Sequence, residues 1–566
     1  MNDVAAASLT TRVDIRGDDA LHFLSLGGSG EIGMNLNLYG HAGKWLMIDL
    51  GITFADDTQP ALDVIMPDIS FIENEREREK LVGLVLTHAH EDHLGAVPYL
   101  WDRLRCPVYC TPFTAAVLKR KLKENGVDFD VPITEVPLSG RFKVGPFDLE
   151  LITLTHSIPE PNAVAIRTRA GTVLHTGDWK LDDTPMVGDV TDEEALRRLG
   201  DEGVLAMMCD STNALREGTS GSEGAVRESL VDLVGRFKNR VAVACFASNV
   251  ARLETMAAVA AKHDRRAALI GRSMWRMQDA ARATGYLADT PEFVSEHDAG
   301  YLPRDKVLLV CTGSQGEPRA ALSRIVADTH PHIVLEKGDA VIFSSRIIPG
   351  NEREIGKLQN QLVKRGVEVV TENDHFVHVS GHPARDELTR MYQWVRPRIA
   401  VPVHGEPRHL AAHVELAKAC QVPEAIEPMN GQVIRLAPGP AAVVATVKSG
   451  RLALDGTTVR PLDSPVLRDR HRLMYNGSAV ATVVLDAKGK LAATPSISAR
   501  GLLDAETEQA ELRAVADAVE AAIEKLSKPD RKDDAAVAEA ARRAVRREIN
   551  SLRGHKPLTD VHVVRI

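Results

Sequence analysis

This chain of 566 residues lacks a membrane-spanning run, a signal peptide and closely paired cysteines. No apolar run approaches the roughly 20 residues that a membrane-spanning helix needs. Residues 1–8 lack the basic start and apolar core of a secretory signal peptide. The six cysteines form no CxxC pair, so we expect reduced thiols, at Cys106, Cys110, Cys209, Cys245, Cys311 and Cys420. We therefore expect a cytoplasmic protein that does not associate with membranes.

An excess of positive charge is missing as well. The 69 basic residues are outnumbered by 78 acidic ones, which gives a formal net charge of −9. Because phosphate binding needs a positive field, this balance argues against a protein that coats nucleic acid without specificity. It leaves room for a nuclease, since only the cleft must be positive and bound metal ions can supply charge there.

Side chains that bind metals are concentrated in one short segment, THAHEDHLG at residues 87–95, directly after the apolar run LVGLVL. Such a run is typical of a buried strand. Side chains alternate along an extended chain, so His88 and His90 point to the same side. Asp92 and His93 fall where the chain turns into the next helix and can face a second point. One segment can thus serve two metal ions, whereas a solvated polar loop would leave this density of ligands unexplained.

Four more apolar runs end at a histidine or an aspartate. They are WLMI before Asp49, LELITLT before His156, TVLHTG before Asp178 and IAVPV before His404. Ligands of open α/β sheets bind at the carboxyl ends of the strands, so we expect these side chains to line one cleft. A single residue of this kind at a strand end is more often structural than a ligand. Together with the first segment, however, the four predict a metal site.

With these motifs the chain resembles the metallo-β-lactamase superfamily, whose α/β core is an αββα sandwich with a di-metal site at one edge. Further motifs resemble those of the β-CASP nucleases, at residues 208–213 (MCDSTN), 378–383 (HVSGHP) and 402–406 (PVHGE). Three more are similar to one branch, bacterial ribonuclease J, at residues 246–249 (FASN), 312–317 (TGSQGE) and 344–352 (SSRIIPGNE). The resemblance extends from about residue 20 to the C-terminus.

The resemblance implies a set of metal ligands. One ion would be held by His88, His90 and His156, the other by Asp92, His93 and His404, with Asp178 bridging both. Imidazole and carboxylate ligands without thiolate favour two zinc ions per chain, with manganese left open. His90 stands where iron-using relatives are expected to carry a carboxylate, which also favours zinc. Two ions about 3.5–4 Å apart acidify water enough for it to attack phosphorus near neutral pH.

The resemblance also implies roles beside the metals. Asp210 and His382 would act as the general acid pair, and Asp49 would orient a metal ligand. Phosphates of the substrate would be bound through hydroxyl groups and backbone amides. The residues expected to bind them are Ser248, Asn249, His378, Val379, Ser380, Gly381 and His382.

The distribution of the motifs predicts the domain organisation. Residues 1–213 would form the first part of the metallo-β-lactamase core, and residues 371–445 would complete it. Between them, strands and helices alternate without metal-type motifs, which is typical of a parallel sheet and predicts an inserted β-CASP α/β domain at 214–370. A linker at 446–465 would lead to a small α/β domain at 466–566.

The resemblance implies a zinc-dependent ribonuclease acting on single-stranded RNA. It would be a 5′→3′ exoribonuclease preferring 5′-monophosphate ends, with endonuclease activity, in mRNA decay and rRNA maturation. A homodimer or homotetramer would form through the C-terminal domain, with other RNA-decay proteins as further partners.

Three alternatives stay open. The resemblance implies that a β-CASP nuclease acting on DNA would lack a histidine at the position of His404. A metallo-hydrolase of small molecules would have no use for the inserted domain. A non-catalytic RNA-binding scaffold would be expected to have lost metal ligands, whereas all seven are present in this sequence.

Overall fold

The computed structural model describes residues 13–55, 58–59 and 61–566. The chain divides into two compact units, one made of Met1–Phe54 and Val64–Leu452 and the other of Ala55–Asp63 and Ala453–Ile566. The N-terminal segment for which we predict no signal peptide lies outside the described residues. Within the described ranges, no helix combines the length and apolar character that crossing a bilayer demands.

Two large sheets form the centre of the first unit. The first has the order β22 (Ala442–Thr446), β21 (Gln432–Ala437), β1 (Leu21–Gly27), β2 (Leu36–His41), β3 (Lys44–Ile48), β6 (Leu81–Val85), β7 (Val108–Cys110) and β8 (Ile133–Glu135). The second has the order β20 (Glu424–Ala425), β19 (Ile399–Val403), β13 (Ala206–Asp210), β12 (Gly171–His175), β11 (Asn162–Thr168), β10 (Phe147–Thr153) and β9 (Arg141–Val144). A short hairpin, β4 (Thr53–Phe54) with β5 (Val64–Pro67), lies outside both sheets.

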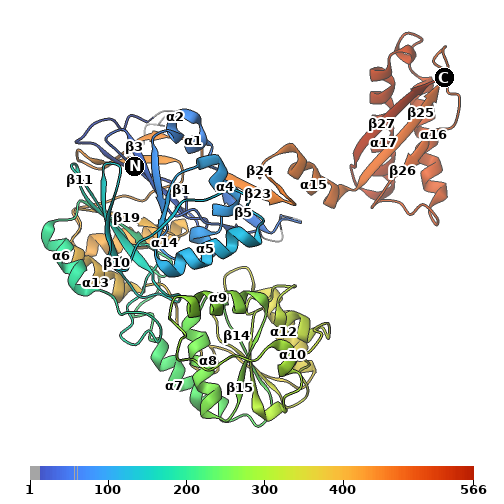
Figure 1. The fold of residues 1–566 in the computed structure, drawn as a ribbon. Coiled ribbons are helices and arrows are strands. Elements are labelled where there is room, and N and C mark those ends of the chain that lie inside the picture. Colours follow the sequence, from blue (N-terminus) through green and yellow to red (C-terminus); the bar gives the residue numbers. More distant parts are fainter. Residues whose placement is uncertain (1–12, 56–57, 60) are drawn as a thin grey trace. The chain divides into compact units, whose positions relative to one another are not determined.

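Alternation along the strands sends side chains to two separate cores. In β10, Leu149 and Leu151 join the core between the two sheets, whereas Ile152 on the opposite face joins a second core. That second core lies under the outer helices α6 (Glu193–Glu202), α13 (Arg385–Val395) and α14 (Pro407–Ala419). The first sheet carries on its outer side α1 (Ser70–Glu73), α2 (Glu75–Arg78), α4 (Val97–Leu104) and α5 (Pro112–Glu124) (Figure 1). The predicted αββα sandwich is confirmed.

A third sheet belongs to the middle of the chain. It is fully parallel, in the order β15 (Arg266–Ile270), β16 (Val307–Cys311), β14 (Val241–Ala244), β17 (Ala340–Phe343) and β18 (Glu368–Val370). The helices of this region are α7 (Glu223–Val234), α8 (Val250–Lys262), α9 (Arg272–Ala283), α10 (Glu296–Ala299), α11 (Ala321–Val326) and α12 (Glu352–Lys364). The inserted α/β domain of the predicted fold is therefore present (Figure 1).

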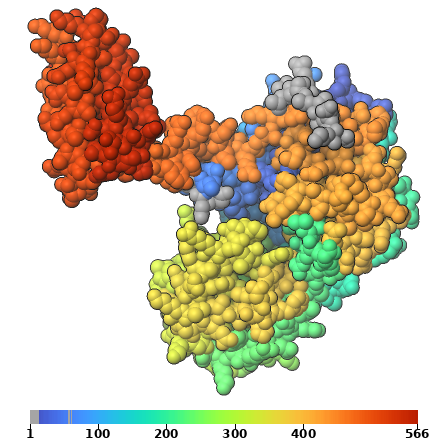
Figure 2. Space-filling model, turned by 180° about the vertical axis from the view of Figure 1, so that it is seen from behind, coloured from blue at the N-terminus to red at the C-terminus, as the bar shows by residue number. Residues whose placement is uncertain are grey.

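The polypeptide leaves the sandwich, builds this third sheet and then returns to it. The return strand β19 pairs parallel with β13, and β21 pairs with β1, so both sheets use segments from before and after the insertion. Figure 2 shows the same interleaving on the surface, where the chain around residues 400–450 (orange) lies against residues of the N-terminal part (blue).

Strand directions bring the polar strand ends to one edge. β12, β13 and β19 are mutually parallel. β10 runs antiparallel to β11, which runs antiparallel to β12, so β10 also ends at this edge. In the facing sheet β3 and β6 are parallel, and β6 leads through residues 87–90 into the short helix α3 (Glu91–Leu94). This topology explains how residues far apart in sequence can share one site.

The second unit has a core of its own. Its three-stranded sheet has the order β26 (Ser496–Ser498), β25 (Ser478–Leu485) and β27 (Leu558–Arg565). Two helices, α16 (Gln509–Glu524) and α17 (Asp534–Arg553), bury apolar residues against one face of the sheet. Three elements precede them, namely β23 (Arg451–Asp455), β24 (Thr458–Pro461) and α15 (Pro465–Asn476). The segment 446–465 expected as a linker thus contains two strands, and the predicted domain boundaries remain a prediction.

Candidate metal centre and active site

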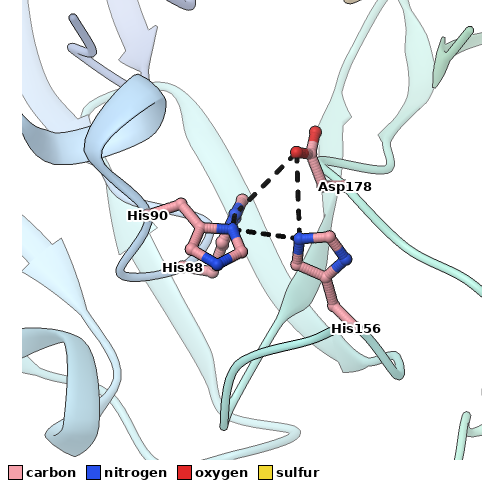
Figure 3. Close-up of side chains that lie close together, drawn as sticks. All are labelled: His88, His90, His156 and Asp178. Carbon is pink, nitrogen blue, oxygen red and sulfur yellow. Dashed lines mark hydrogen bonds and ion pairs between the residues drawn. The ribbon is translucent and has the colours of Figure 1, made fainter. Parts of the chain in front are cut away.

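Three histidine nitrogens converge at the carboxyl ends of β6 and β10. Nδ1 of His90 lies 3.0 Å from Nε2 of His88 and 3.0 Å from Nε2 of His156. One oxygen of Asp178, from the loop after β12, lies 4.0 Å from the Nε2 atoms of both His88 and His156 (Figure 3). These four side chains form a group that could hold a metal ion.

The protein fixes the far nitrogen of two of these rings. The Thr87 hydroxyl donates to Asp49, so it accepts from Nδ1–H of His88 and leaves Nε2 as an acceptor facing the site. The backbone carbonyl of Gly381 accepts from Nδ1–H of His156 with the same result. A Cβ at position 381 would lie 2.7 Å from the His156 ring, so only glycine fits here. Both rings are held as the tautomer that a metal ion requires.

A second group of four side chains shares Asp178 with the first. It consists of Asp92, His93, Asp178 and His404. Asp178 Oδ2 lies 3.2 Å from Nε2 of His93 and 3.4 Å from Nε2 of His404. Asp92 Oδ2 lies 3.5 Å and 3.6 Å from the same two nitrogens. The two groups together contain all seven residues for which the sequence predicts metal binding.

Asp49 lies behind this second group and belongs to neither. Its carboxylate accepts from the backbone N–H of Thr87 at 2.8 Å and from Nδ1–H of His93 at 2.7 Å. Asp49 and His404 both adopt left-handed backbone conformations, with φ of 64° and 54°. Aspartate and histidine tolerate this region better than most residues, and it is enriched at functional sites.

The donor set fits divalent metal ions. Two imidazole nitrogens oriented as acceptors, Nε2 of His88 and of His156, converge with Nδ1 of His90 beside the Asp178 carboxylate, an arrangement of lone pairs and negative charge that a cation between them would stabilise. Two buried atoms, Nε2 of His404 and Oδ1 of Asp178, have no hydrogen-bond partner among the described residues. Histidine and carboxylate are ordinary ligands of zinc and manganese.

Burial sets the protonation of the first group. It lowers the pKa of His90 to about 4 and holds the pKa of His88 and of His156 well below the usual value, where neighbouring histidines add to the effect. Metal ions bind neutral imidazole, so no proton has to be displaced from these rings near neutral pH. Burial opposes the charge of Asp178, but His404 and His93 keep the pKa of that carboxyl well below its usual range.

A histidine–carboxylate pair lies beside the two groups. Nδ1 of His382 is 2.8 Å from Oδ2 of Asp210 and 3.8 Å from Oδ2 of Asp178. Burial lowers the pKa of His382, but the adjacent Asp210 carboxylate outweighs burial and raises it to about 9. Asp178, Asp210 and His382 also form a third group of possible metal ligands.

The residues expected to bind phosphate lie in two places. Residues 378–382 reach the centre directly, through Gly381 and His382. The Ser380 hydroxyl accepts from the Asn213 amide at 2.8 Å, and the same amide donates to the His382 carbonyl at 2.9 Å. Ser248 and Asn249 lie at the start of α8, where the Asn249 side chain caps the helix. Neither forms a hydrogen bond to the clustered histidines and aspartates in the described part of the chain.

Sequence reasoning assigned no role to three polar residues that hold the site together. Thr87 joins Asp49 to His88, and Asn213 holds the loop of His382. Asn35 contacts His404, from which it is separated by 369 positions. Thr87 and Asn213 lie within motifs, so their position was a usable signal. Asn35 follows a glycine-rich turn and gave no such signal.

A buried ionic network connects the loop of His378 to the rest of the inserted domain. The guanidinium of Arg252, which is 0% exposed, donates to Glu223 at 2.8 Å and to the carbonyl of Val377 at 3.0 Å. The backbone N–H of Glu223 in turn donates to Asp182, which pairs with the buried Lys180 at 2.7 Å. These bonds anchor residue 377, immediately before His378.

We expect Arg252→Met to lower the free energy of unfolding of this region by about 3–5 kcal/mol, because it leaves the Glu223 carboxylate buried without its partner. Adding Glu223→Gln removes that charge and should restore much of the loss. Urea unfolding of the single and double variants measures both effects. A double variant no more stable than Arg252→Met would show that the unpaired charge is not the cause.

Four family models match successive parts of the chain. They are "Metallo-beta-lactamase superfamily" at residues 34–230, "Ribonuclease J, beta-CASP domain" at 238–362, "Zn-dependent metallo-hydrolase RNA specificity domain" at 366–424 and "Ribonuclease J C-terminal domain" at 465–566. Together with the clustered histidines and aspartates, they define a metal-dependent nuclease of the metallo-β-lactamase superfamily with an inserted β-CASP domain.

Relatives along the full length define the family. The chain is 44% identical over 558 residues to the ribonuclease J of Sinorhizobium meliloti, covering 98% of this chain and 99% of that one. It is 38% identical over 550 residues to the ribonuclease J of Mycolicibacterium smegmatis, covering 96% and 97%. A solved Enterococcus faecalis protein of unknown function has the same fold, with 17% identity and a TM-score of 0.51 over 74% of this chain and 100% of that one. The chain belongs to the ribonuclease J family.

Proposed function

We propose that this protein is a two-zinc ribonuclease that degrades single-stranded RNA from 5′-monophosphorylated ends in the 5′→3′ direction and also cleaves internally. Its processes would be mRNA decay and rRNA maturation, in the cytoplasm, together with other RNA-decay proteins. The observation that carries the proposal is the shared carboxylate: Asp178 belongs to both ligand groups, and the hydrogen-bonded pair of His382 and Asp210 lies directly beside it.

The residues present would divide the chemistry among them. Ions bound by the two groups would supply Lewis acidity, which acidifies water and neutralises charge on phosphoryl oxygens. Asp49 and Thr87 keep His93 and His88 in the ligating tautomer. Asp210 accepts from Nδ1–H of His382, which leaves the other ring nitrogen free to donate a proton to the leaving oxygen.

Binding of the RNA backbone would fall to small side chains and backbone amides near the centre. Residues 378–381 form a loop that is tied to a metal ligand through the Gly381 carbonyl and to Asn213 through Ser380. Ser248 and Asn249, at the start of α8, would bind a phosphate further along the strand. Glycine and hydroxyl residues suit this task because they let oxygens approach the backbone closely.

Digestion of RNA labelled at its 3′ end and carrying a 5′-monophosphate or a 5′-triphosphate tests the proposal. A 5′→3′ exonuclease shortens the monophosphorylated RNA progressively and spares the triphosphorylated end. Internal cleavage instead gives products of intermediate length from both. The same assay with single-stranded DNA and with a chromogenic lactam separates the alternative classes. Cleavage of DNA or lactam in preference to RNA would contradict the proposal.

We also infer assembly through residues 466–566. This module has a core of its own, and β27 forms one edge of its sheet, with Val564 43% exposed and Ile566 73% exposed. An open edge strand can pair with the same strand of a second copy.

Removing residues 466–566 should therefore convert a homodimer or homotetramer into smaller species. Cleavage of a short oligonucleotide should persist, because every clustered ligand lies before residue 405. Light scattering of the full and shortened chains measures the number of copies per particle, and Val564→Lys in the full chain provides a point variant at the edge strand. An equal number of copies in all three proteins would contradict the inference.

A further inference from the structure

We infer that Asn35 is the positioning residue that sets the orientation of both histidines in the second ligand group, and thereby the affinity of that group for a divalent ion. The inference rests on the metal site proposed above and concerns how this chain builds it. Asn35 lies just before β2, is 3% exposed and ligates nothing itself in the proposed scheme.

The amide of Asn35 contacts two residues of the group with opposite ends. Its oxygen lies 3.0 Å from Nδ1 of His404. Its nitrogen donates to the backbone carbonyl of Asp92 at 3.0 Å and lies 3.1 Å from Nε2 of His93. A backbone carbonyl can only accept, so the nitrogen must face Asp92 and the oxygen must face His404.

This orientation determines the tautomer of His404. An amide oxygen can only accept, so Nδ1 of His404 carries a proton and Nε2 is the nitrogen left to bind a cation. That Nε2 is buried without a hydrogen-bond partner among the described residues, and it faces carboxylate oxygens of Asp178 and Asp92 at 3.4 Å and 3.6 Å. In the neutral ring this nitrogen presents a lone pair to two carboxylates, and a proton or a metal ion between them removes the repulsion. Asn35 therefore holds His404 in the form that binds a metal ion.

The same amide favours the ligating form of His93. Asp49 accepts from Nδ1–H of that ring, and the nitrogen of the Asn35 amide lies 3.1 Å from its Nε2. The backbone reinforces the arrangement, because the Asn35 N–H donates to the Asp92 carbonyl at 2.9 Å.

The turn after β1 and the residues that follow β19 both pack around this amide. His404 N–H donates to the carbonyl of Gly28 at 2.6 Å, and Ser29 bridges to Gly405. A Cβ at position 28 would lie 2.2 Å from the Asn35 amide oxygen, so the backbone there leaves space only for glycine, at φ of +89°. The turn between β1 and β2 thus holds the end of the return strand β19 at the centre through backbone contacts and through the Asn35 side chain.

Zinc alone is the probe for the test, with binding to the purified full chain measured in competition with a chromogenic chelator. Loss of an outer hydrogen-bond partner of a ligating histidine lowers metal affinity about 10- to 100-fold. We expect Asn35→Ala to lose one of two zinc ions at chelator concentrations where the wild type keeps both. The ion of the first group should remain, because Asn35 makes no hydrogen bond to His88, His90 or His156 in the described structure.

Asn37→Ala is the matched control. Asn37 lies two positions further along on β2, is 2% exposed and makes no side-chain hydrogen bond to the clustered residues in the described structure. It should keep both ions. Asn35→Asp preserves the acceptor for His404 but loses both donors, so its zinc affinity should lie between those of the wild type and Asn35→Ala, and it serves if the alanine variant does not fold.

Wild-type affinity in both Asn35 variants, or equal loss in the Asn37 variant, would overturn the assignment. A wild-type chain that binds no zinc would instead overturn the metal site itself. A second readout needs no activity: in cobalt-loaded protein, the visible absorption of one of the two ions should change in Asn35→Ala and stay unchanged in Asn37→Ala.

Discussion

Replacing His88 and His90 together by alanine reduces RNA cleavage to trace levels while the protein stays folded; this is the largest effect we expect. Both rings belong to the first ligand group, so the double variant leaves only His156 and Asp178 there. Two ligands do not hold an ion against water, and the Lewis acidity that the reaction needs is lost with it.

The fold should survive because these side chains oppose stability when no ion is bound. Both rings are buried polar groups at a crowded site, and the neutral Nε2 of His88 faces the Asp178 carboxylate, which is unfavourable for the metal-free chain. Circular dichroism of the metal-free proteins should therefore give similar spectra, and the variant should unfold at a temperature no lower than that of the wild type. Metal analysis should show fewer ions per chain in the variant.

The control is the double variant His297→Ala and His332→Ala. These two rings also face each other, with centroids 5.2 Å apart, but they lie in the inserted domain and outside every group of possible ligands in the described residues. Activity should be unchanged. Removing metal from the wild type with a chelator should abolish activity, and zinc or manganese should restore it. More than trace activity in the His88 and His90 variant, in metal-depleted buffer, would contradict the two-ion mechanism.

Local sequence singled out the seven clustered residues together with Asp49, and the resemblance divided the seven into two ligand groups. Each lies in a segment that follows an apolar run. These runs form strands whose directions bring their carboxyl ends to the same edge of the sandwich. His404 shows the strength of this signal: it lies 226 positions after Asp178 in the sequence, yet the run IAVPV and the following Gly405 identified it before its neighbours were known. The inserted sheet was predictable for the same reason, since its buried parallel strands are continuous apolar runs.

What the sequence could not reveal are partnerships between polar residues that have no local pattern. Asn35 acts on His404 only because β1 lies beside β21 and close to the end of β19, which is a property of the whole topology. Arg252 and Glu223 resemble ordinary charges on a helix until the fold buries them as a pair. The strand β24 was not predicted, because it is only four residues long and lies in the segment expected as a linker.

His382→Ala should lower turnover by about 10²–10⁴-fold, the usual contribution of a positioned general acid. Metal content should stay at the wild-type level, because His382 belongs to neither the first nor the second ligand group. Asp210→Asn should have an effect in the same range. The two residues act as one unit through the 2.8 Å hydrogen bond, so the double variant should be little worse than either single one.

The geometry offers a competing role for His382, and the experiment separates the two. Asp178, Asp210 and His382 also come close enough to hold an ion of their own. If His382 were a ligand there, His382→Ala would release metal, and added zinc would restore part of the activity. If His382 is the acid, added zinc has no effect on the variant. The variant should then recover the lost cleavage rate on an RNA whose 3′-side leaving group departs without being protonated. A phosphorothiolate linkage, with sulfur as the leaving atom, provides that substrate. If His382→Ala loses zinc and still cleaves the phosphorothiolate slowly, His382 is a metal ligand and not the general acid.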